Sequence, residues 1–238
     1  MGPTQIVPPL LYRDALMLVI DKPAGMAVHP SPGGGPSLTA SLDALRFGLP
    51  RRPEAAHRLD RETSGCLALG RHRQALARLG KLFSENKVEK VYWAVVEGGP
   101  DAQEGEIDLP LGPRSPDPKS WLMKVDPAGQ PSLTRWRVLG RGEGETWLEL
   151  RPVTGRTHQL RVHCAAQGWP ILGDRIYGSG GGRLQLHARS LTVPLHPKKP
   201  AIRVEAPPPP HMLDRLAALG CEAASDSSAD MRAGSAAS

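Results

Sequence analysis

One aspartate, Asp60, stands between two arginines, Arg58 and Arg61, within the stretch His57–Gly65. Nearby positive charge favours the ionised form of a carboxyl group. An ionised carboxylate is a poor proton donor near neutral pH, but it is well suited to act as a nucleophile. Taken alone, the stretch is more simply explained as a solvated salt-bridge turn between two strands, so other parts of the chain must decide.

Other chemistries fit the sequence less well. A glycosidase needs paired carboxylates, and Glu62 is the only acid beside Asp60. The flanking arginines make neither carboxyl group an obvious proton donor. Ser64 lies outside any Gly-x-Ser-x-Gly motif of a serine hydrolase. The glycine triplets form neither Gly-x-Gly-x-x-Gly nor a Walker-type loop, which disfavours a nucleotide cofactor. On a helix, His158 and His163 would lie about 140° apart, which disfavours a shared metal.

The composition indicates a soluble protein that can meet a polyanionic partner. The 238 residues carry 30 Lys and Arg against 24 Asp and Glu, which gives a net charge of +6 and a pI near 9.5. Three widely spaced cysteines form neither a disulfide framework nor a metal motif, which indicates a reducing, cytoplasmic setting. The sequence has no apolar run of membrane-spanning length and no signal pattern at its N-terminus.

Strand-like and helix-like patterns surround His57–Gly65. Short apolar or alternating runs predict strands at 16–20, 66–69, 90–98, 133–139, 146–150 and 184–194. Apolar residues at helical spacing predict helices at 37–45, with Ser37 as the N-cap, and at 72–85. A third helix is predicted from an N-cap at Thr157 to a stop at Gly168.

These elements predict one α+β domain over residues 11–206, because they do not follow the regular βαβ alternation of a parallel sheet. We expect a mostly antiparallel sheet. The proline-rich residues 1–10 are predicted to be an N-terminal arm. Residues 207–238 are predicted to be a largely disordered Pro/Ala/Ser-rich tail with a possible short helix around 213–219.

Three residues outside the opening stretch have ordinary explanations when each is taken alone. Tyr92, on a predicted half-buried strand, reads as a core residue with a solvated hydroxyl. Arg156 and Arg161 read as surface charges, although an arginine-bearing glycine turn that opens a helix is also a ready anion site. These separate explanations leave unexplained the combination of an isolated carboxylate, a strand tyrosine and an arginine at a helix start.

Six segments, in order across residues 16–200, resemble the RluA-type family of RNA pseudouridine synthases. The segments are Asp21–Gly25 with Val28–Pro30, His57–Gly65, Lys90–Ala94, Thr154–His163, Pro170–Asp174 and Leu184–Ala188. A single motif could arise by chance, whereas six in the family's order are highly specific. The resemblance implies an α+β fold with a mixed, mainly antiparallel sheet, flanking helices and a central RNA-binding cleft, and it implies no cofactor or metal.

The resemblance also implies roles for particular residues. Asp60 matches the family's nucleophilic aspartate, Tyr92 its active-site tyrosine, and Arg161 the basic partner of the aspartate. Arg58 matches the arginine that helps to displace and replace the target base. Leu186 matches a hydrophobic residue that packs the uracil pocket.

Contacts to the RNA are further expected from His57, Arg156 and His158. The family pattern begins close to the N-terminus, so we expect RNA selection to depend on the catalytic domain and on the loops 31–36 and 112–131. A monomer is the default expectation.

The implied reaction is the isomerisation of uridine to pseudouridine in structured rRNA or tRNA, after the base has been flipped out of the RNA. Asp60 either attacks the sugar or abstracts a sugar proton, and the sequence leaves both routes open. Two other functions compete with this one. A non-catalytic RNA-binding module on the same fold would not need the set of Asp60, Tyr92 and Arg161, and a hydrolase would release free uracil.

Overall fold

The structure is a computed structural model that describes residues 6–30, 34–117 and 121–221. Parts of the predicted arm, of both predicted loops and of the predicted tail therefore lie outside the described residues. The chain divides into two compact units, Met1–Lys90 with Ala188–Pro207, and Val91–His187 with Pro208–Ser238. The division falls inside two strands, β5 (Glu89–Glu97) and β11 (Leu186–Val193).

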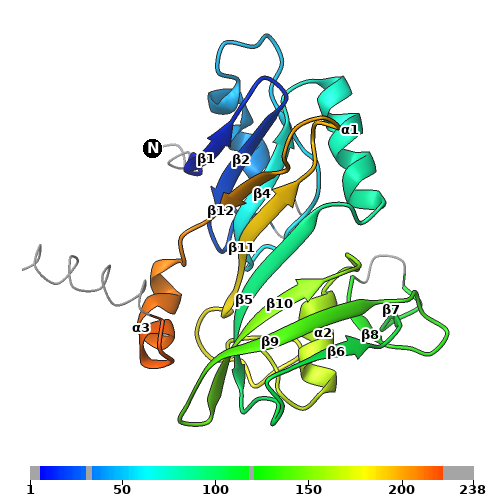
Figure 1. Cartoon of the computed structure of the whole chain (residues 1–238), viewed down its shortest axis with the longest axis vertical. Coiled ribbons are helices and arrows are strands. Elements are labelled where there is room, and N and C mark those ends of the chain that lie inside the picture. The colour runs from blue at the N-terminus through cyan, green and yellow to red at the C-terminus, as the bar shows by residue number, and fades with distance from the viewer. Residues whose placement is uncertain (1–5, 31–33, 118–120, 222–238) are drawn as a thin grey trace, which may run out of the picture. The chain divides into compact units, whose positions relative to one another are not determined.

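A sheet forms the centre of the first unit (Figure 1). Besides β11 its strands are β1 (Leu10–Arg13), β2 (Met17–Lys22), β3 (Glu54–Ala55), β4 (Ser64–Gly70) and β12 (Ile202–Glu205). The strand order is β1-β2-β4-β11, with β3 beside β4 and β12 beside β11. Pairing is antiparallel between β1 and β2, β2 and β4, β3 and β4, and β11 and β12.

The apolar run of β2 explains why this strand lies inside the sheet. All four residues Met17–Ile20 have no exposed surface. Successive side chains on a strand point to opposite faces, so a continuous apolar run indicates burial on both. Met17 and Val19 pack in one cluster with Leu79 of helix α1 (Arg73–Ser84), as the helical spacing in residues 72–85 predicts.

The helix predicted at 37–45 is present as a 3₁₀ helix, η1 (Leu38–Leu45). Leu38, Leu42 and Leu45 are all buried, as their spacing predicts. Ser37 precedes the helix, but its side chain makes no capping hydrogen bond. The predicted burial and the N-cap position of Ser37 are therefore confirmed, although the serine side chain does not cap the helix.

The second unit is built on an antiparallel sheet in the order β5-β10-β9-β6 (Figure 1). A separate antiparallel hairpin joins β7 to β8. Two helices, α2 and α3, complete the unit. The bounds are β6 Glu104–Asp108, β7 Leu111–Pro113, β8 Met123–Val125, β9 Leu133–Gly142, β10 Glu145–Pro152, α2 Gln159–Ala166 and α3 Pro210–Ala218.

Alternation along β5 separates the two apolar faces of this sheet. Ala94 and Val96 pack in one cluster with Leu160 of α2, and Val95 packs in another with Met212 of α3. All of the β5 residues concerned are fully buried. The two helices therefore cover opposite faces of the same strand, as the period of two requires.

Helix α3 confirms the possible short helix expected around 213–219, and it begins earlier, at Pro210, in a stretch otherwise predicted to be largely disordered. Its residues Met212 and Leu216 have no exposed surface and pack with Trp147 and Val95. Proline at the first helical position suits a helix start, and the spacing of the two apolar residues places them on one face. The described residues of this stretch end at Cys221, and the rest of the predicted tail lies outside them.

The start of α2 also differs from the prediction. The N-cap is His158, in the left-handed conformation with φ 54°, and its side chain makes no capping hydrogen bond. The side chain of Gln159 instead accepts the Arg156 N–H at 3.0 Å and the Thr154 hydroxyl at 2.7 Å. A side-chain amide therefore organises the turn for which Thr157 was predicted as the cap.

None of the helices within the described residues is long and apolar enough to cross a membrane.

Candidate active site

Asp60 lies in the loop that leads into β4. Its backbone carbonyl accepts the Thr63 N–H at 3.2 Å, which closes a turn. Leu59 and Thr63 are 6% and 2% exposed, so both ends of this turn are anchored in the protein. Asp60 itself is only half-buried. The loop therefore presents a carboxylate to solvent from a backbone that is held in place.

A buried lysine, Lys22, lies under the turn that contains Asp60. Its ammonium donates hydrogen bonds to the carbonyl oxygens of Pro23 at 3.0 Å, Met26 at 2.8 Å and Arg61 at 3.0 Å. All three ammonium donors are thereby used. The lysine joins the turn after β2 to the loop that contains Asp60, which no motif in the sequence predicts.

Two opposing effects set the pKa of Lys22. Burial lowers it from 10.5 to about 8, and the negative charges of Asp60 and Glu62 oppose this shift. The lysine is fully buried, so it contributes through its hydrogen bonds and its field and does not reach solvent. It is a positioning residue for the loop.

Replacing Lys22 with methionine is expected to lower the free energy of unfolding by about 3 kcal/mol, because three carbonyl acceptors lose a charged donor. The wild type should also gain stability as pH rises from about 8 to 10.5, since the unfolded chain binds the lysine proton more tightly in that window. The variant should lack this rise. Urea unfolding at pH 7.5 and 9.5 measures both effects, with the exposed Lys81→Met as control. A loss no larger than that of the control would contradict the role.

His57, which is half-buried, supports the same loop. Its ring stacks on Phe83 with centroids 4.2 Å apart, and its Nε2 accepts the Ala68 N–H at 3.0 Å. Burial lowers the pKa of His57 to about 3, so the ring is neutral at physiological pH. Because one ring face and one nitrogen are occupied, we assign His57 to the support of the loop, and its predicted contact with RNA gains no support.

The pH dependence of stability should report this neutral histidine. A pKa lowered on folding means that the unfolded chain binds the proton first, so stability falls as pH falls below about 6.5. Between pH 7 and pH 5 the His57 contribution is roughly 2 kcal/mol. His57→Gln should lose that much less stability over this interval, measured by urea unfolding. His29 is exposed, so His29→Gln should lose as much stability as the wild type between pH 7 and pH 5. An equal loss in His57→Gln would contradict the assignment.

The two arginines beside Asp60 differ in their surroundings. The Arg61 guanidinium donates to the carbonyl of Gly34, and its own backbone carbonyl accepts the Gly25 N–H at 2.9 Å. Arg58 is exposed, and its guanidinium forms no hydrogen bond or ion pair with the described part of the chain. Arg61 therefore helps to hold the loop, whereas Arg58 projects from it.

Gly65, the last residue of the stretch His57–Gly65, must be glycine for two structural reasons. Its φ is +105°, and a Cβ built on it would lie 2.3 Å from the carbonyl oxygen of Ala188. Both the backbone conformation and the close approach of β11 therefore require glycine. The loop enters the sheet at this point, so Gly65 helps to fix where the chain leaves Asp60.

The second unit contains Tyr92 and Leu186, and both residues are associated with the same apolar cluster. Tyr92, on β5, is half-buried and packs against the cluster that contains Leu186, which is 3% exposed. An aromatic side chain with one face in an apolar cluster has its polar end oriented toward the surface.

Arg161 of α2 forms a buried bidentate ion pair with Asp174. Its Nε and Nη2 each donate to the carboxylate at 2.7 Å, and the two side chains are 7% and 0% exposed. The same carboxylate accepts the N–H groups of Ile176 at 2.9 Å and Tyr177 at 3.1 Å. Burial alone would raise the pKa of Asp174, but the hydrogen bonds and charge of Arg161 hold it below its usual value.

Asp174 is a residue to which the sequence assigned no role. Its only signal was its place at the end of the motif Pro170–Asp174. It fixes the orientation of Arg161, because a bidentate pair leaves a planar guanidinium little freedom to turn. The predicted pairing of Arg161 with Asp60 stays a prediction.

The predicted RNA contacts Arg156 and His158 lie at the start of α2. His158 is 7% exposed and its Nδ1 lies 2.8 Å from the Tyr177 hydroxyl, which accepts the Met123 N–H at 3.0 Å. The histidine therefore ties the turn before α2 to the β7–β8 hairpin. Arg156 is exposed, and its Nε donates to the carbonyl of Pro131 at 3.3 Å.

Comparisons with known proteins identify the family to which these motifs belong. Residues 16–166 match the family model described as RNA pseudouridylate synthase. An uncharacterized RNA pseudouridine synthase of Zymomonas mobilis is 45% identical over 210 residues, which cover 86% of this chain and 95% of that protein. Ribosomal large subunit pseudouridine synthase C of Vibrio cholerae is 36% identical over 220 residues, which cover 87% of this chain and 68% of that protein.

A solved structure gives the same result. Human RNA Pseudouridylate Synthase Domain Containing 4 superimposes with a TM-score of 0.74 at 27% identity, over 89% of this chain and 92% of that chain. The chain belongs to the RNA pseudouridine synthase family and is an RNA uridine isomerase. The α+β fold with a mixed, mainly antiparallel sheet is confirmed. The roles of individual residues stay predictions.

Proposed function

We propose that this protein isomerises specific uridines in structured rRNA or tRNA, with Asp60 as the essential carboxylate. The observation that carries this proposal is the loop around Asp60. Its carboxylate is half-buried, its turn is anchored at both ends, and a lysine joins it to β2 from below. A fixed backbone with an accessible carboxylate is the arrangement that attack on a bound sugar requires.

The proposed reaction balances without any oxidant or cofactor. In one route the Asp60 carboxylate bonds to C1′ as the C1′–N1 bond breaks, and its electron pair leaves with the uracil. The uracil turns, C5 attacks C1′, and the carboxylate is released. The C5 proton is then lost and N1 gains a proton. In the other route Asp60 removes a sugar proton first and later returns it.

Tyr92 and Leu186 are proposed to form the site of the uracil. Leu186 belongs to an apolar cluster against which Tyr92 packs, which supports this assignment. The aromatic face of Tyr92 can stack on a base, and its hydroxyl is a candidate for proton transfer at the rotated ring. Arg161, oriented by Asp174, is proposed to be the basic partner of Asp60.

Arg58 is proposed to take the place of the target base in the RNA stack. Its exposure on the Asp60 loop supports this role. Flipping a uridine out of structured RNA costs a few kcal/mol in lost stacking, which an inserted side chain offsets. The net charge of +6 suits phosphate contacts, so binding should weaken as salt rises. The three free cysteines support the proposed cytoplasmic location.

Large-subunit rRNA is the first substrate to test, because the Vibrio cholerae relative is named as a large-subunit synthase. Unmodified transcripts of large-subunit rRNA and pooled tRNAs would be incubated with the protein, digested to nucleosides and analysed by mass spectrometry. Pseudouridine in one transcript, at a defined position, is the expected product. Free uracil would indicate a hydrolase, and unchanged uridine in both RNA classes would contradict the proposed substrates.

A further inference from the structure

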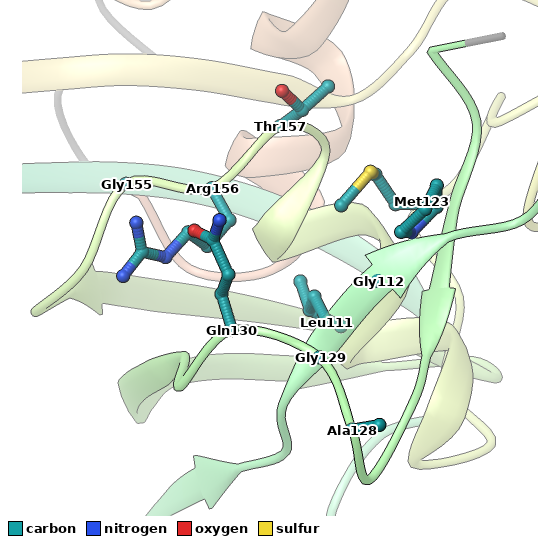
Figure 2. Close-up of a pocket in the computed structure, with 10 residues that line it drawn as sticks. Leu111, Gly112, Met123, Ala128, Gly129, Gln130, Gly155, Arg156 and Thr157 are labelled. Atoms are coloured by element: carbon teal, nitrogen blue, oxygen red, sulfur yellow. The ribbon is translucent and has the colours of Figure 1, made fainter. Parts of the chain in front are cut away.

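A pocket of about 480 Å³ lies in the second unit, beside the start of α2 (Figure 2). Its volume falls in the range of small-molecule sites in proteins. We call it the hairpin pocket. Its lining comes from the β7–β8 hairpin, from residues 128–130 and from the turn 155–157, and comprises Leu111, Gly112, Pro113, Met123, Ala128, Gly129, Gln130, Gly155, Arg156 and Thr157.

The backbone fixes the floor of the hairpin pocket. Leu111 and Gln130 exchange two hydrogen bonds, with N–O distances of 2.9 and 2.8 Å. A Cβ added to Gly129 would lie 2.4 Å from the carbonyl carbon of Leu111. The segment 128–130 therefore lies directly on β7, and only glycine permits this approach. The backbone of the folded chain therefore fixes the shape of the pocket floor.

Two polar side chains at the pocket are available for a ligand. Figure 2 shows the guanidinium of Arg156 beside the amide of Gln130, and the Arg156 bond to Pro131 places it there. Arg156 is not ion-paired within residues 6–30, 34–117 and 121–221. The Gln130 amide likewise has no hydrogen bond to this described part of the chain. A cation suits phosphate, and an amide can read the edge of a base.

Apolar side chains form the other wall. Leu111 is buried and Met123 half-buried, and Met123 lies across the pocket from Arg156 (Figure 2). Trp121, two residues before Met123 in the chain, is 55% exposed, and its ring makes a T-shaped contact with His158 at 5.0 Å between centroids. An exposed indole held by a neighbouring ring is a stacking platform for a base.

We propose that the hairpin pocket binds an unpaired nucleotide of the RNA substrate other than the uridine that is isomerised. Its phosphate would contact Arg156, its base edge Gln130, and a neighbouring base the face of Trp121. This inference rests on the proposed function, because it takes RNA as the substrate. The hairpin pocket would then help this protein to select its RNA substrate independently of the reacting residues.

Two variants of the hairpin pocket test the proposal by different means. Arg156→Ala removes the cation, and Ala128→Trp fills the space without changing charge. Arg78→Ala, an exposed arginine on α1, is the matched control. Steady-state kinetics on the RNA that the wild type modifies should show KM raised about tenfold in both pocket variants, with kcat within twofold of the wild type. The control should match the wild type in both constants.

Binding by the catalytically inactive Asp60→Asn protein separates the pocket from the reaction. In filter binding to large-subunit rRNA and tRNA transcripts, Arg156→Ala should reduce the slope of log Kd against log salt by about one, and Ala128→Trp should leave the slope unchanged. If both pocket variants have the same KM and Kd as the protein without the pocket substitution, the proposal is overturned, whereas the proposed function is unaffected. A wild type that modifies no RNA would overturn the proposed function, while the binding arm would still decide on the pocket.

Discussion

Asp60→Asn is expected to reduce pseudouridine formation by at least about 10⁴-fold, because an amide can neither bond to C1′ nor accept a sugar proton. The fold should be unaffected. Asp60 is half-buried, and its contribution to the turn is a backbone carbonyl, which asparagine keeps. RNA affinity should stay within about threefold of the wild type, since one carboxylate in a basic loop contributes little to phosphate binding.

Glu62 provides the matched control for this result. It is exposed, lies in the same turn and also carries a carboxylate. Glu62→Gln should keep nearly full activity, so loss of activity only in the Asp60 variant assigns the chemistry to one residue. Substantial turnover by Asp60→Asn, measured as pseudouridine per RNA by mass spectrometry, would contradict the mechanism.

Arg161→Ala is expected to lower the free energy of unfolding by about 3–5 kcal/mol. The variant leaves the carboxylate of Asp174, whose side chain is 0% exposed, without its bidentate partner. That carboxylate still accepts two backbone N–H groups, so it stays in place as an uncompensated charge. Activity should also fall, because Arg161 is proposed to be the basic partner of Asp60 in the reaction.

A double-mutant cycle separates the ion pair from other effects of Arg161. The double variant Arg161→Ala/Asp174→Ala should lose clearly less stability than the sum of the two single variants, because removing both partners leaves no buried charge. Arg183→Ala, an exposed arginine of the same unit, should change stability by less than about 0.5 kcal/mol. Additive losses in urea unfolding would show that the pair is not coupled.

Elements with a strong local pattern could be predicted from the sequence. The apolar run in 16–20 predicted β2, helical spacing in 72–85 predicted α1, and the runs at 133–139 and 146–150 predicted β9 and β10. In each case the signal and the element lie in the same few residues. Asp60 could be found for a related reason, since the motif His57–Gly65 is contiguous.

The residues that support the site could not be predicted in this way. Lys22 reaches the carbonyl of Arg61, and Arg161 reaches Asp174, 39 and 13 residues away along the chain. Burial of a charge is visible only when the partners that satisfy it are placed in space. The supporting contacts of His57 could not be predicted for the same reason, because its stacking on Phe83 is visible only in the structure.

The flanks of helix α3 left only a possible short helix in the prediction. Three prolines precede it, a fourth is its first residue, and an Ala/Ser-rich stretch follows, so composition indicated disorder around it. Its apolar face is narrow, with Met212 and Leu216 as its buried residues. What orders the helix is a tertiary partner, the apolar surface around Val95 and Trp147, and no local pattern reveals such a surface.

The most direct test of the central claim is tritium release from RNA labelled at C5 of uridine. Each conversion to pseudouridine replaces the C5 hydrogen with a bond to C1′, so the wild type should release one tritium for each pseudouridine formed, with no free uracil. Asp60→Asn should release none, and Glu62→Gln should release nearly as much as the wild type. Tritium release by the Asp60 variant at a rate near that of the wild type would contradict the account.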